Sequence, residues 1–428
     1  MLPIKLFMGR EKSGGIVLLF SVALAMVLAN TNLATSYFHF FEQKVGFIVN
    51  GEPYLNCSLH HWINDGLMAM FFFVVGLELK REFIGGELAD IRNTILPIGA
   101  AIGGMIVPAL IFLSLNIGTP QTMGWGIPMA TDIAFALGVV YLLGDKVPVS
   151  AKVFLTTLAI VDDLGAVLVI AFFYTSELSI ASLLFGLCFL AVMFIGNRLG
   201  IKSLFFYAAL GIGGVWVTFL LSGIHATIAA VLAAFMIPAD AKINESVYLK
   251  RIKRLTRRFE KEEANEVRTL EEGQVDVLTH IQHDTTIAIP LLQQLEHKMA
   301  PIVTFLIMPI FAIANAGISF TDLSLSDIFS THVALGVTLG LFLGKPIGIV
   351  SAIFFMVKMR WATLPSAITP RTLLGLGMLA SIGFTMSMFI STLAFTDELL
   401  MTQAKLGIFL ASILGGIGGY VLLNKKSK

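Results

Sequence analysis

The chain of 428 residues is 56% hydrophobic and only 13% charged, and its mean hydropathy is +0.85. Soluble proteins carry about 25% charged residues, so a soluble enzyme is excluded, as are disordered, collagen-like and coiled-coil chains. The net charge of +1 points to no nucleic-acid partner, and the two cysteines, Cys57 and Cys188, make no disulfide framework. The composition is that of an all-α polytopic membrane protein in a lipid bilayer.

Twelve apolar stretches are candidate transmembrane helices, because a helix needs about 20 mostly apolar residues to cross the hydrocarbon. They lie near residues 14–32, 60–79, 95–116, 122–143, 150–174, 180–197, 204–221, 223–238, 292–318, 332–357, 372–396 and 403–424. The seventh and eighth are short, and the join between them, at Ser222-Gly223, is the least distinct. We expect no cleavable signal peptide, since the first stretch is long and no small-residue cleavage motif follows it. Residues 1–428 are therefore interpreted as one membrane domain.

Basic residues are unevenly divided between the two sides of this predicted bundle. When the loops are assigned alternately to the two sides, nearly all Lys and Arg residues fall on one side, and only Lys44 and Lys405 fall on the other. The positive-inside rule then places both termini in the cytoplasm. The same bias supports an even number of spans, because an odd miscount would scramble it.

One large hydrophilic segment, residues 239–290, interrupts the apolar pattern on the cytoplasmic side. A basic run from Lys250 to Arg254 is followed by an acidic run between Glu260 and Glu266. Opposite charges at helical spacing could support a solvated helix. We expect a flexible cytoplasmic loop that lies partly on anionic lipid, with a dedicated regulatory domain as the alternative.

Ionisable residues inside predicted spans are the main functional signal, because each costs several kcal/mol or more in the bilayer interior. Asp162 and Asp163 are adjacent in the middle of the fifth span, and nothing structural requires two neighbouring carboxylates there. Adjacent helical residues point about 100° apart, so one can face a cavity while the other meets a neighbouring helix. Lys345, in the tenth span, is the natural counter-charge for the second.

The aspartate pair has a chemical consequence. Two carboxylates in a low dielectric cannot both ionise at low cost, so their titrations are coupled. Carboxylate oxygens are also suitable ligands for a hard cation. Protons and a small cation would then compete for the same oxygens, which in outline is an exchange mechanism.

The other embedded ionisable residues have structural alternatives. Asp65 and Glu78 lie near span ends, where facing water explains them as well as a function does. His225 begins the eighth span and is better explained as a helix-start histidine at the outer interface. Asp132, in the middle of the fourth span, could have a structural role as the side chain that pairs with a break in a helix.

Two predicted spans contain helix-breaking residues at similar depth. Gly126 and Pro128 precede Thr131-Asp132 in the fourth span, and the eleventh contains the stretch 381–385, Ser-Ile-Gly-Phe-Thr. Interrupted spans in corresponding positions of two halves indicate a transporter site, and spans three to five and ten to twelve have the opposite orientations that an inverted repeat requires. Helix ends carry partial charge, so Asp132 could neutralise facing N-terminal ends and Lys345 facing C-terminal ends.

With these residues in place, the chain resembles the bacterial NhaA sodium/proton antiporter family. The resemblance runs over nearly the whole chain except residues 239–290. The matching stretches are Ser13–Gly15, Trp62–Asp65, Gly76–Glu82, Thr131–Gly138, Asp162–Gly165, Ser222–Thr227, Phe311–Gly317, Gly344–Gly348 and Gly383–Ser387.

This resemblance implies a twelve-helix fold with an inverted-topology repeat and crossed, discontinuous fourth and eleventh helices. It implies electrogenic exchange of sodium or lithium for more than one proton, with no enzymatic activity and no cofactor. By position, Asp163 matches the principal cation-binding carboxylate, with Asp132 and Thr131 near the site. Asp162 matches the partner of the membrane lysine, here Lys345, and proton carriage is assigned to the group.

Members of this family are activated as cytoplasmic pH rises. By resemblance, the sensing cluster maps onto Glu78, Glu82, Glu296, His297 and Lys298. A further histidine position of that cluster is Ala300 here, and the 239–290 insertion enters just upstream. Both departures bear on the pH at which activation occurs.

Family members also form dimers through a short extracellular β-hairpin, which would fall within residues 44–58 here. An Asn50-Gly51 pair between apolar residues predicts the turn, with an ordinary loop as the alternative. The resemblance therefore implies a homodimer in the bacterial inner membrane that regulates cytoplasmic pH and sodium.

Three other classes compete with antiport. A sodium-coupled solute symporter of related fold is the main alternative, but it needs a larger cavity with groups for an organic substrate, and no candidate set is evident. An intramembrane aspartyl protease requires two aspartates on separate helices, one in a Gly-x-Gly-Asp motif, and the stretch Leu142–Asp145 fails that motif. A channel is disfavoured by a charged pair at mid-depth without a ring of repeats.

Overall fold

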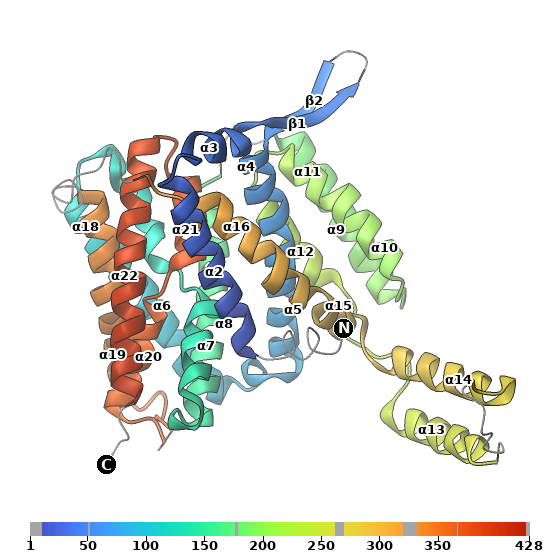
Figure 1. Cartoon of the computed structure of the whole chain (residues 1–428). Helices are drawn as coiled ribbons and strands as arrows, with labels where there is room; N and C mark the ends of the chain where they lie inside the picture. The colour runs from blue at the N-terminus through green and yellow to red at the C-terminus, as the bar shows by residue number, and fades with distance from the viewer. Residues whose placement is uncertain are drawn as a thin grey trace.

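The computed structural model describes residues 11–49, 52–175, 179–261, 269–319, 332–365 and 367–424, and it is predominantly helical. Most helices run up or down one bundle, as Figure 1 shows, and a β-hairpin projects from one end. A separate helical hairpin extends sideways from the opposite end. The first described helix starts, and the last one ends, at the end away from the β-hairpin.

The elements of the first half, with η1 and η5 π-helical and η2 to η4 of the 3-10 type, are α2 (Glu11–Ala29), α3 (Ala34–Glu42), β1 (Lys44–Val49), β2 (Glu52–Ser58), α4 (Leu59–His61), η1 (Trp62–Leu67), α5 (Met68–Gly85), η2 (Glu87–Ala89), α6 (Ile91–Asn116), η3 (Pro120–Met129), α7 (Ile133–Leu143), η4 (Gly144–Lys146), α8 (Val149–Phe173), α9 (Ile180–Arg198), α10 (Leu204–Ala208), η5 (Ala209–Trp216), α11 (Val217–Leu220) and α12 (Ala226–Met236). The elements of the second half, with η6 and η7 π-helical, are α13 (Glu245–Phe259), α14 (Glu272–Ala288), α15 (Leu291–Ile302), η6 (Val303–Ile307), α16 (Met308–Asn315), α18 (His332–Leu339), η7 (Gly340–Gly344), α19 (Lys345–Lys358), α20 (Pro370–Ala380), α21 (Phe384–Ala394) and α22 (Glu398–Asn424).

The described residues contain eight helices long and apolar enough to cross a membrane, or up to ten if each of two bent pairs is one span. The bent pairs are α2 with α3, at 111°, and α20 with α21, at 45°. Two shorter apolar helices, Leu204–Leu220 and Ala226–Met236, occupy the seventh and eighth predicted stretches. The chain turns between them at Gly223, whose φ is +83°. Helices therefore occur in all twelve predicted stretches, while the length criterion supports eight to ten spans.

Glycines bring α6 and α19 into backbone contact. A Cβ added to Gly348 would lie 2.1 Å from the carbonyl oxygen of Gly103, and one added to Gly103 would lie 2.4 Å from the carbonyl oxygen of Gly348. Lipid supplies no hydrophobic drive for helix association, so close packing of small residues is what holds membrane helices together. This contact fixes the position of Lys345, the first residue of α19.

The predicted β-hairpin is confirmed. Strand β1 pairs antiparallel with β2, with Lys44 opposite Ser58 and Val49 opposite Glu52. The predicted turn residues, Asn50 and Gly51, lie outside the described residues.

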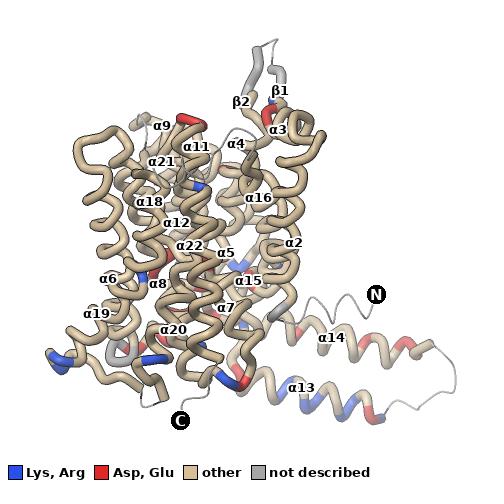
Figure 2. Tube along the Cα trace, turned by 60° about the vertical axis from the view of Figure 1, so that its left-hand side comes forward, with Lys and Arg blue, Asp and Glu red and all other residues tan. Residues whose placement is uncertain are grey.

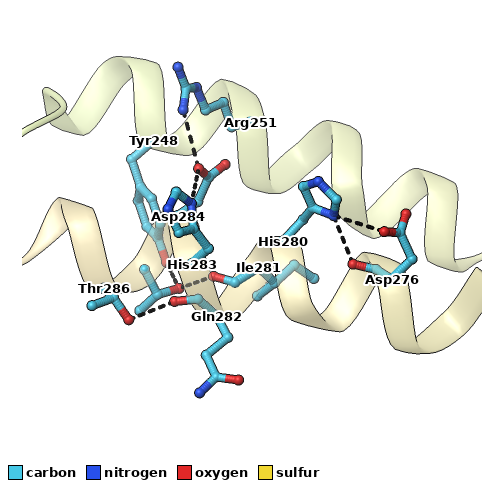
Figure 3. Close-up of polar contacts among 10 residues, drawn as sticks. Tyr248, Arg251, Asp276, His280, Ile281, Gln282, His283, Asp284 and Thr286 are labelled. Carbon is cyan, nitrogen blue, oxygen red and sulfur yellow. Dashed lines mark hydrogen bonds and ion pairs between the residues drawn. The ribbon is translucent and has the colours of Figure 1, made fainter.

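The expectation of a flexible loop is wrong for most of residues 239–290. Helices α13 and α14 pack against each other, and Val277 of α14 is fully buried. Arg251 lies 3.2 Å from Asp284 and Arg258 lies 3.1 Å from Asp276, and Figure 3 shows the first of these contacts. Basic residues lie along α13, as Figure 2 shows. The predicted acidic run extends into residues 262–268, which lie outside the described residues.

We predict that Gly348→Ala lowers the melting temperature of the purified protein. The added methyl group must push α19 away from the α6 backbone, and such overpacking costs about 1–3 kcal/mol. Gly85→Ala is the control, because no atom lies within 4 Å of its added Cβ. Equal melting temperatures for the two variants would contradict the proposed close contact.

Candidate ion site

The fourth and eleventh predicted spans are interrupted, and their interruptions are bonded to each other. The 3-10 segment η3 ends at Met129, extended backbone follows, and α7 begins at Ile133. Helix α20 ends at Ala380 and α21 begins at Phe384. The N–H of Asp132 donates to the carbonyl oxygen of Ile382 over 2.6 Å, so the two breaks meet in the interior of the bundle.

The Asp132 carboxylate caps two helices at once. Its Oδ1 accepts from the N–H of Phe135, in the first turn of α7, at 3.1 Å. Its Oδ2 accepts from the N–H of Thr385 at 3.0 Å and from the hydroxyl of Thr385, in the first turn of α21. Because helix N-terminal ends carry partial positive charge, this carboxylate is placed to neutralise both.

Hydroxyl groups satisfy the carbonyls at the ends of the preceding segments. Thr131 Oγ1 donates to the carbonyl of Ala380 at 2.8 Å, and Ser387 Oγ donates to that of Ile127, also at 2.8 Å. Each hydroxyl comes from the opposite interrupted segment. The structure therefore shows hydroxyl hydrogen bonds at these C-terminal ends, and the neutralisation of the same ends by the charge of Lys345 stays a prediction.

Lys345 contacts Asp162, the partner that the sequence predicts. Its Nζ lies 2.5 Å from Asp162 Oδ2, and neither side chain is exposed. Asp162 comes from the middle of α8, and Lys345 directly follows the π-helical segment η7. Thr131 is also close enough to interact with Asp162. The pair is thus an ion pair that is fully enclosed by protein.

Asp163 has a different environment from its neighbour. It is 1% exposed, and neither carboxylate oxygen has a hydrogen-bond partner among the described residues. The charges of Asp162, Asp132, Glu78 and Lys345 all act on it. A buried carboxylate without a donor is costly unless it takes up a proton or a cation, and its oxygens suit a hard cation.

No group of three or more His, Cys, Asp or Glu side chains among the described residues is arranged to hold a metal ion. The three aspartates therefore do not form a preformed carboxylate cage. Any cation at Asp163 would need other oxygens as ligands, such as backbone carbonyls, hydroxyls or water.

The residues predicted to sense pH lie mainly between α5 and α15. Arg81 joins two of them, with 2.6 Å to Glu296 and 2.8 Å to Glu82. The charges of all three act on Glu78, one turn away on α5. Sequence reasoning missed Arg81, although it lies within the stretch Gly76–Glu82.

The other two members of that predicted group, His297 and Lys298, are exposed on α15. The charge of His297 acts on Glu296. Ala300 is on the same helix, in the next turn.

The two remaining candidates lie toward the β-hairpin end. His225 Nε2 is 2.7 Å from the carbonyl oxygen of Tyr174, just after α8, and α12 begins at the next residue. This is the helix-start position that the structural alternative predicted. Asp65 Oδ2 lies 3.1 Å from His61 Nε2.

Thr385 and Ser387 are functional candidates that sequence reasoning did not single out. The available signal was the hydroxyl residues flanking each break, since short hydroxyl side chains readily cap helix ends. Which carbonyl or carboxylate each hydroxyl meets depends on the packing of segments far apart in the chain.

The fold and the site together define a multi-pass membrane protein that encloses carboxylates and a lysine beside two interrupted helices, as ion transporters do. The family model described as "Na+/H+ antiporter 1" matches residues 5–423. The chain therefore belongs to this family.

Similar proteins cover the chain almost end to end. The chain is 48% identical to Na(+)/H(+) antiporter NhaA 2 of Syntrophotalea carbinolica, over 99% of this chain and 97% of that protein. It is 46% identical to Na(+)/H(+) antiporter NhaA of Wolinella succinogenes, over 98% and 92%. It is 48% identical to the NhaA antiporter of Helicobacter pylori strain J99, over 99% and 95%.

We predict that Lys345→Ala lowers the melting temperature strongly. Removing one partner of a buried ion pair leaves the other charge uncompensated, which costs about 3–5 kcal/mol. Replacing both partners by apolar residues, in Lys345→Met with Asp162→Leu, should recover most of that loss. A single variant that melts like the wild type, or a double variant that melts below the single one, would contradict the ion-pair assignment.

Proposed function

We propose that this protein is a secondary active, electrogenic antiporter that exports Na⁺ or Li⁺ across the bacterial inner membrane in exchange for protons. By this exchange it would regulate cytoplasmic pH and sodium. One observation carries the proposal: Asp163, on a membrane-spanning helix, is buried with both carboxylate oxygens free of hydrogen-bond donors among the described residues. The names of the relatives, all Na(+)/H(+) antiporters, support it.

The coupling follows from competition at Asp163. The ionised carboxylate is costly in this environment, so it binds either a proton or a sodium ion, but not both. A site that is neutralised in either way can face the other side of the membrane, while the empty ionised site crosses poorly. This rule links outward movement of the cation to inward movement of protons.

The Asp162–Lys345 pair supplies a second titratable unit next to the cation site. Its charges act on Asp163, so a cation arriving there changes the balance that holds the pair together. We assign proton carriage to Asp163 and this pair as a group. More than one proton for each sodium ion would move net positive charge inward in each cycle.

Asp132 and Thr131 complete the proposed site in a supporting position. Both Asp132 oxygens already accept hydrogen bonds from the two capped helices. We therefore assign Asp132 chiefly to balancing those helix ends, with its charge contributing to the field at Asp163.

For the membrane topology we propose twelve spans, with both termini in the cytoplasm. The even count is supported by the positive charge bias, and both ends of the described chain lie at the end of the bundle away from the β-hairpin (Figure 1). In this arrangement the two interrupted segments are the crossed helices of an inverted repeat, and the β-hairpin is extracellular. Pairing between the hairpins of two copies would make a homodimer.

The insertion 239–290 is proposed to be a cytoplasmic accessory unit. Its base is closed by the N–H of Lys242, which donates to the carbonyl of Ile287 at 3.1 Å. Gln294 of α15 donates to the carbonyl of Thr286 at 2.6 Å, and α15 carries Glu296. The unit thus contacts the helix that bears part of the proposed pH-sensing cluster of Glu78, Glu82, Glu296, His297 and Lys298.

We predict that Asp163→Asn abolishes exchange while the protein still inserts in the membrane, because the site loses its ionisable ligand. The assay is proton flux in everted vesicles from a host without its own sodium/proton antiporters, with Na⁺ or Li⁺ added across a pH series. Asp145→Asn, an exposed carboxylate between α7 and α8, makes the same chemical change outside the site and should retain exchange.

Retained sodium-driven proton flux in Asp163→Asn would refute this assignment. No response from the inserted wild-type protein at any pH would refute antiport itself. It would favour the sodium-coupled solute symporter.

We predict that replacing residues 243–286 by a short Gly-Ser linker spares exchange but changes the pH of half-maximal activity. The linker can be short because the flanking backbone atoms are already in hydrogen-bond contact. The variant Arg251→Gln with Asp284→Asn is the matched control, since it removes one ion pair between α13 and α14 but keeps both helices. Complete loss of transport in the correctly inserted deletion variant would mean that the insertion is part of the transport machinery.

A further inference from the structure

A separate pocket lies where the base of the β-hairpin meets the bundle, away from the buried carboxylates. Its lining includes Cys57 at the end of β2, His61 of α4, Trp62 and Asp65 of η1, and Trp216 of η5. The cavity volume is about 200 Å³. A cavity of roughly 150 Å³ holds a benzene ring, so this pocket has room for one aromatic ring with a small substituent.

Both walls that carry the tryptophans are π-helical. Trp62 begins η1 (Trp62–Leu67), and Trp216 ends η5 (Ala209–Trp216). π-Helical turns are rare and are frequent at functional sites, because the wider turn displaces side chains from the regular helical position. Two such turns from distant parts of the chain meet at this one pocket.

The tryptophans present an aromatic surface to the cavity. Their ring centroids are 6.4 Å apart and the ring planes are inclined by 31°. The Trp62 indole N–H donates to the carbonyl oxygen of Val45 at 2.9 Å, which fixes the orientation of that ring against the base of the hairpin. Tryptophan is the best aromatic partner for a cation.

A carboxylate completes the pocket chemistry. The Asp65 side chain is 16% exposed and contacts His61, which is 50% exposed. Tryptophans that merely anchor a protein at the bilayer surface face lipid headgroups. Here both share one hollow with a partly accessible carboxylate, so the pocket combines an apolar aromatic surface with an anionic group.

We propose that this pocket binds a small aromatic organic cation, such as an amidinium. The ring packs against Trp62 and Trp216, and the positive group meets the carboxylate of Asp65. The attraction combines cation–π contact with a charge-assisted hydrogen bond. Binding at this pocket requires no transport, so the proposal stands or falls independently of the antiport function.

Tryptophan fluorescence tests this directly. The chain has four tryptophans, and the other two, Trp125 and Trp361, pack against Phe173 and Phe355. The variant Trp125→Phe with Trp361→Phe therefore keeps only the two pocket reporters. This full-length protein, in lipid nanodiscs, is titrated with benzamidinium and with benzamide, which has a similar shape and no charge.

We expect a saturable fluorescence change with benzamidinium. Benzamide should bind more weakly by about tenfold or more, because it lacks the charge and therefore loses at least one charge-assisted contact. Asp65→Asn in the same background should weaken benzamidinium binding by a similar factor. Asp397→Asn, an exposed carboxylate just before α22, should leave it unchanged. Equal affinity for the two probes, or undiminished binding by Asp65→Asn, would overturn the proposal.

A second measurement leaves every pocket residue intact. In a Cys188→Ser variant, Cys57 is the single thiol, since the chain has two cysteines. Saturating benzamidinium should slow alkylation of Cys57 by a maleimide, and benzamide should not. Unchanged alkylation in the presence of benzamidinium would also overturn the proposal.

Discussion

The contact between the two interrupted segments is the constraint on which the rest of the proposed ion site depends. Breaking a helix inside a membrane exposes backbone donors and acceptors that water cannot satisfy, at a cost of several kcal/mol for each unsatisfied group. Here each break supplies the groups that the other one needs: Asp132 bonds to the start of α21, and Ser387 bonds to a carbonyl near the end of η3. Neither break could exist without the other in register, so the site forms only when both halves of the bundle have packed.

Two adjacent residues of α8 have different environments. Asp162 meets Lys345 in an enclosed ion pair, whereas Asp163 lies without a hydrogen-bond donor among the described residues. The rotation of about 100° between adjacent helical residues accounts for the contrast. An enclosed ion pair and a carboxylate without a hydrogen-bond donor among the described residues can thus be neighbours in sequence and share one helix.

The sequence predicted candidate site residues where the burial of a single charged side chain is itself energetically costly. Asp162, Asp163 and Lys345 stand out because charges are rare in apolar stretches, and the Asn50-Gly51 pair supports the β-hairpin that the family resemblance implies. Apart from the pairing of Asp162 with Lys345, the long-range contacts were not predicted: the bond of Thr385 to Asp132, and the link of Arg81 to Glu296, join segments distant in the chain. The insertion was misjudged because its polar composition gives no sign that α13 and α14 pack against each other or that Val277 is fully buried.

The glycine contact between α6 and α19 has a consequence for the membrane lysine. Lysines in membrane helices usually extend their aliphatic stems so that the ammonium reaches the headgroup region. Lys345 is preceded by Gly344, whose added Cβ would meet the Pro108 backbone at 2.8 Å, and Gly348 follows one turn later. Its own side chain is completely buried. The ammonium therefore cannot snorkel to either surface, and its charge has to be balanced at the depth where it lies.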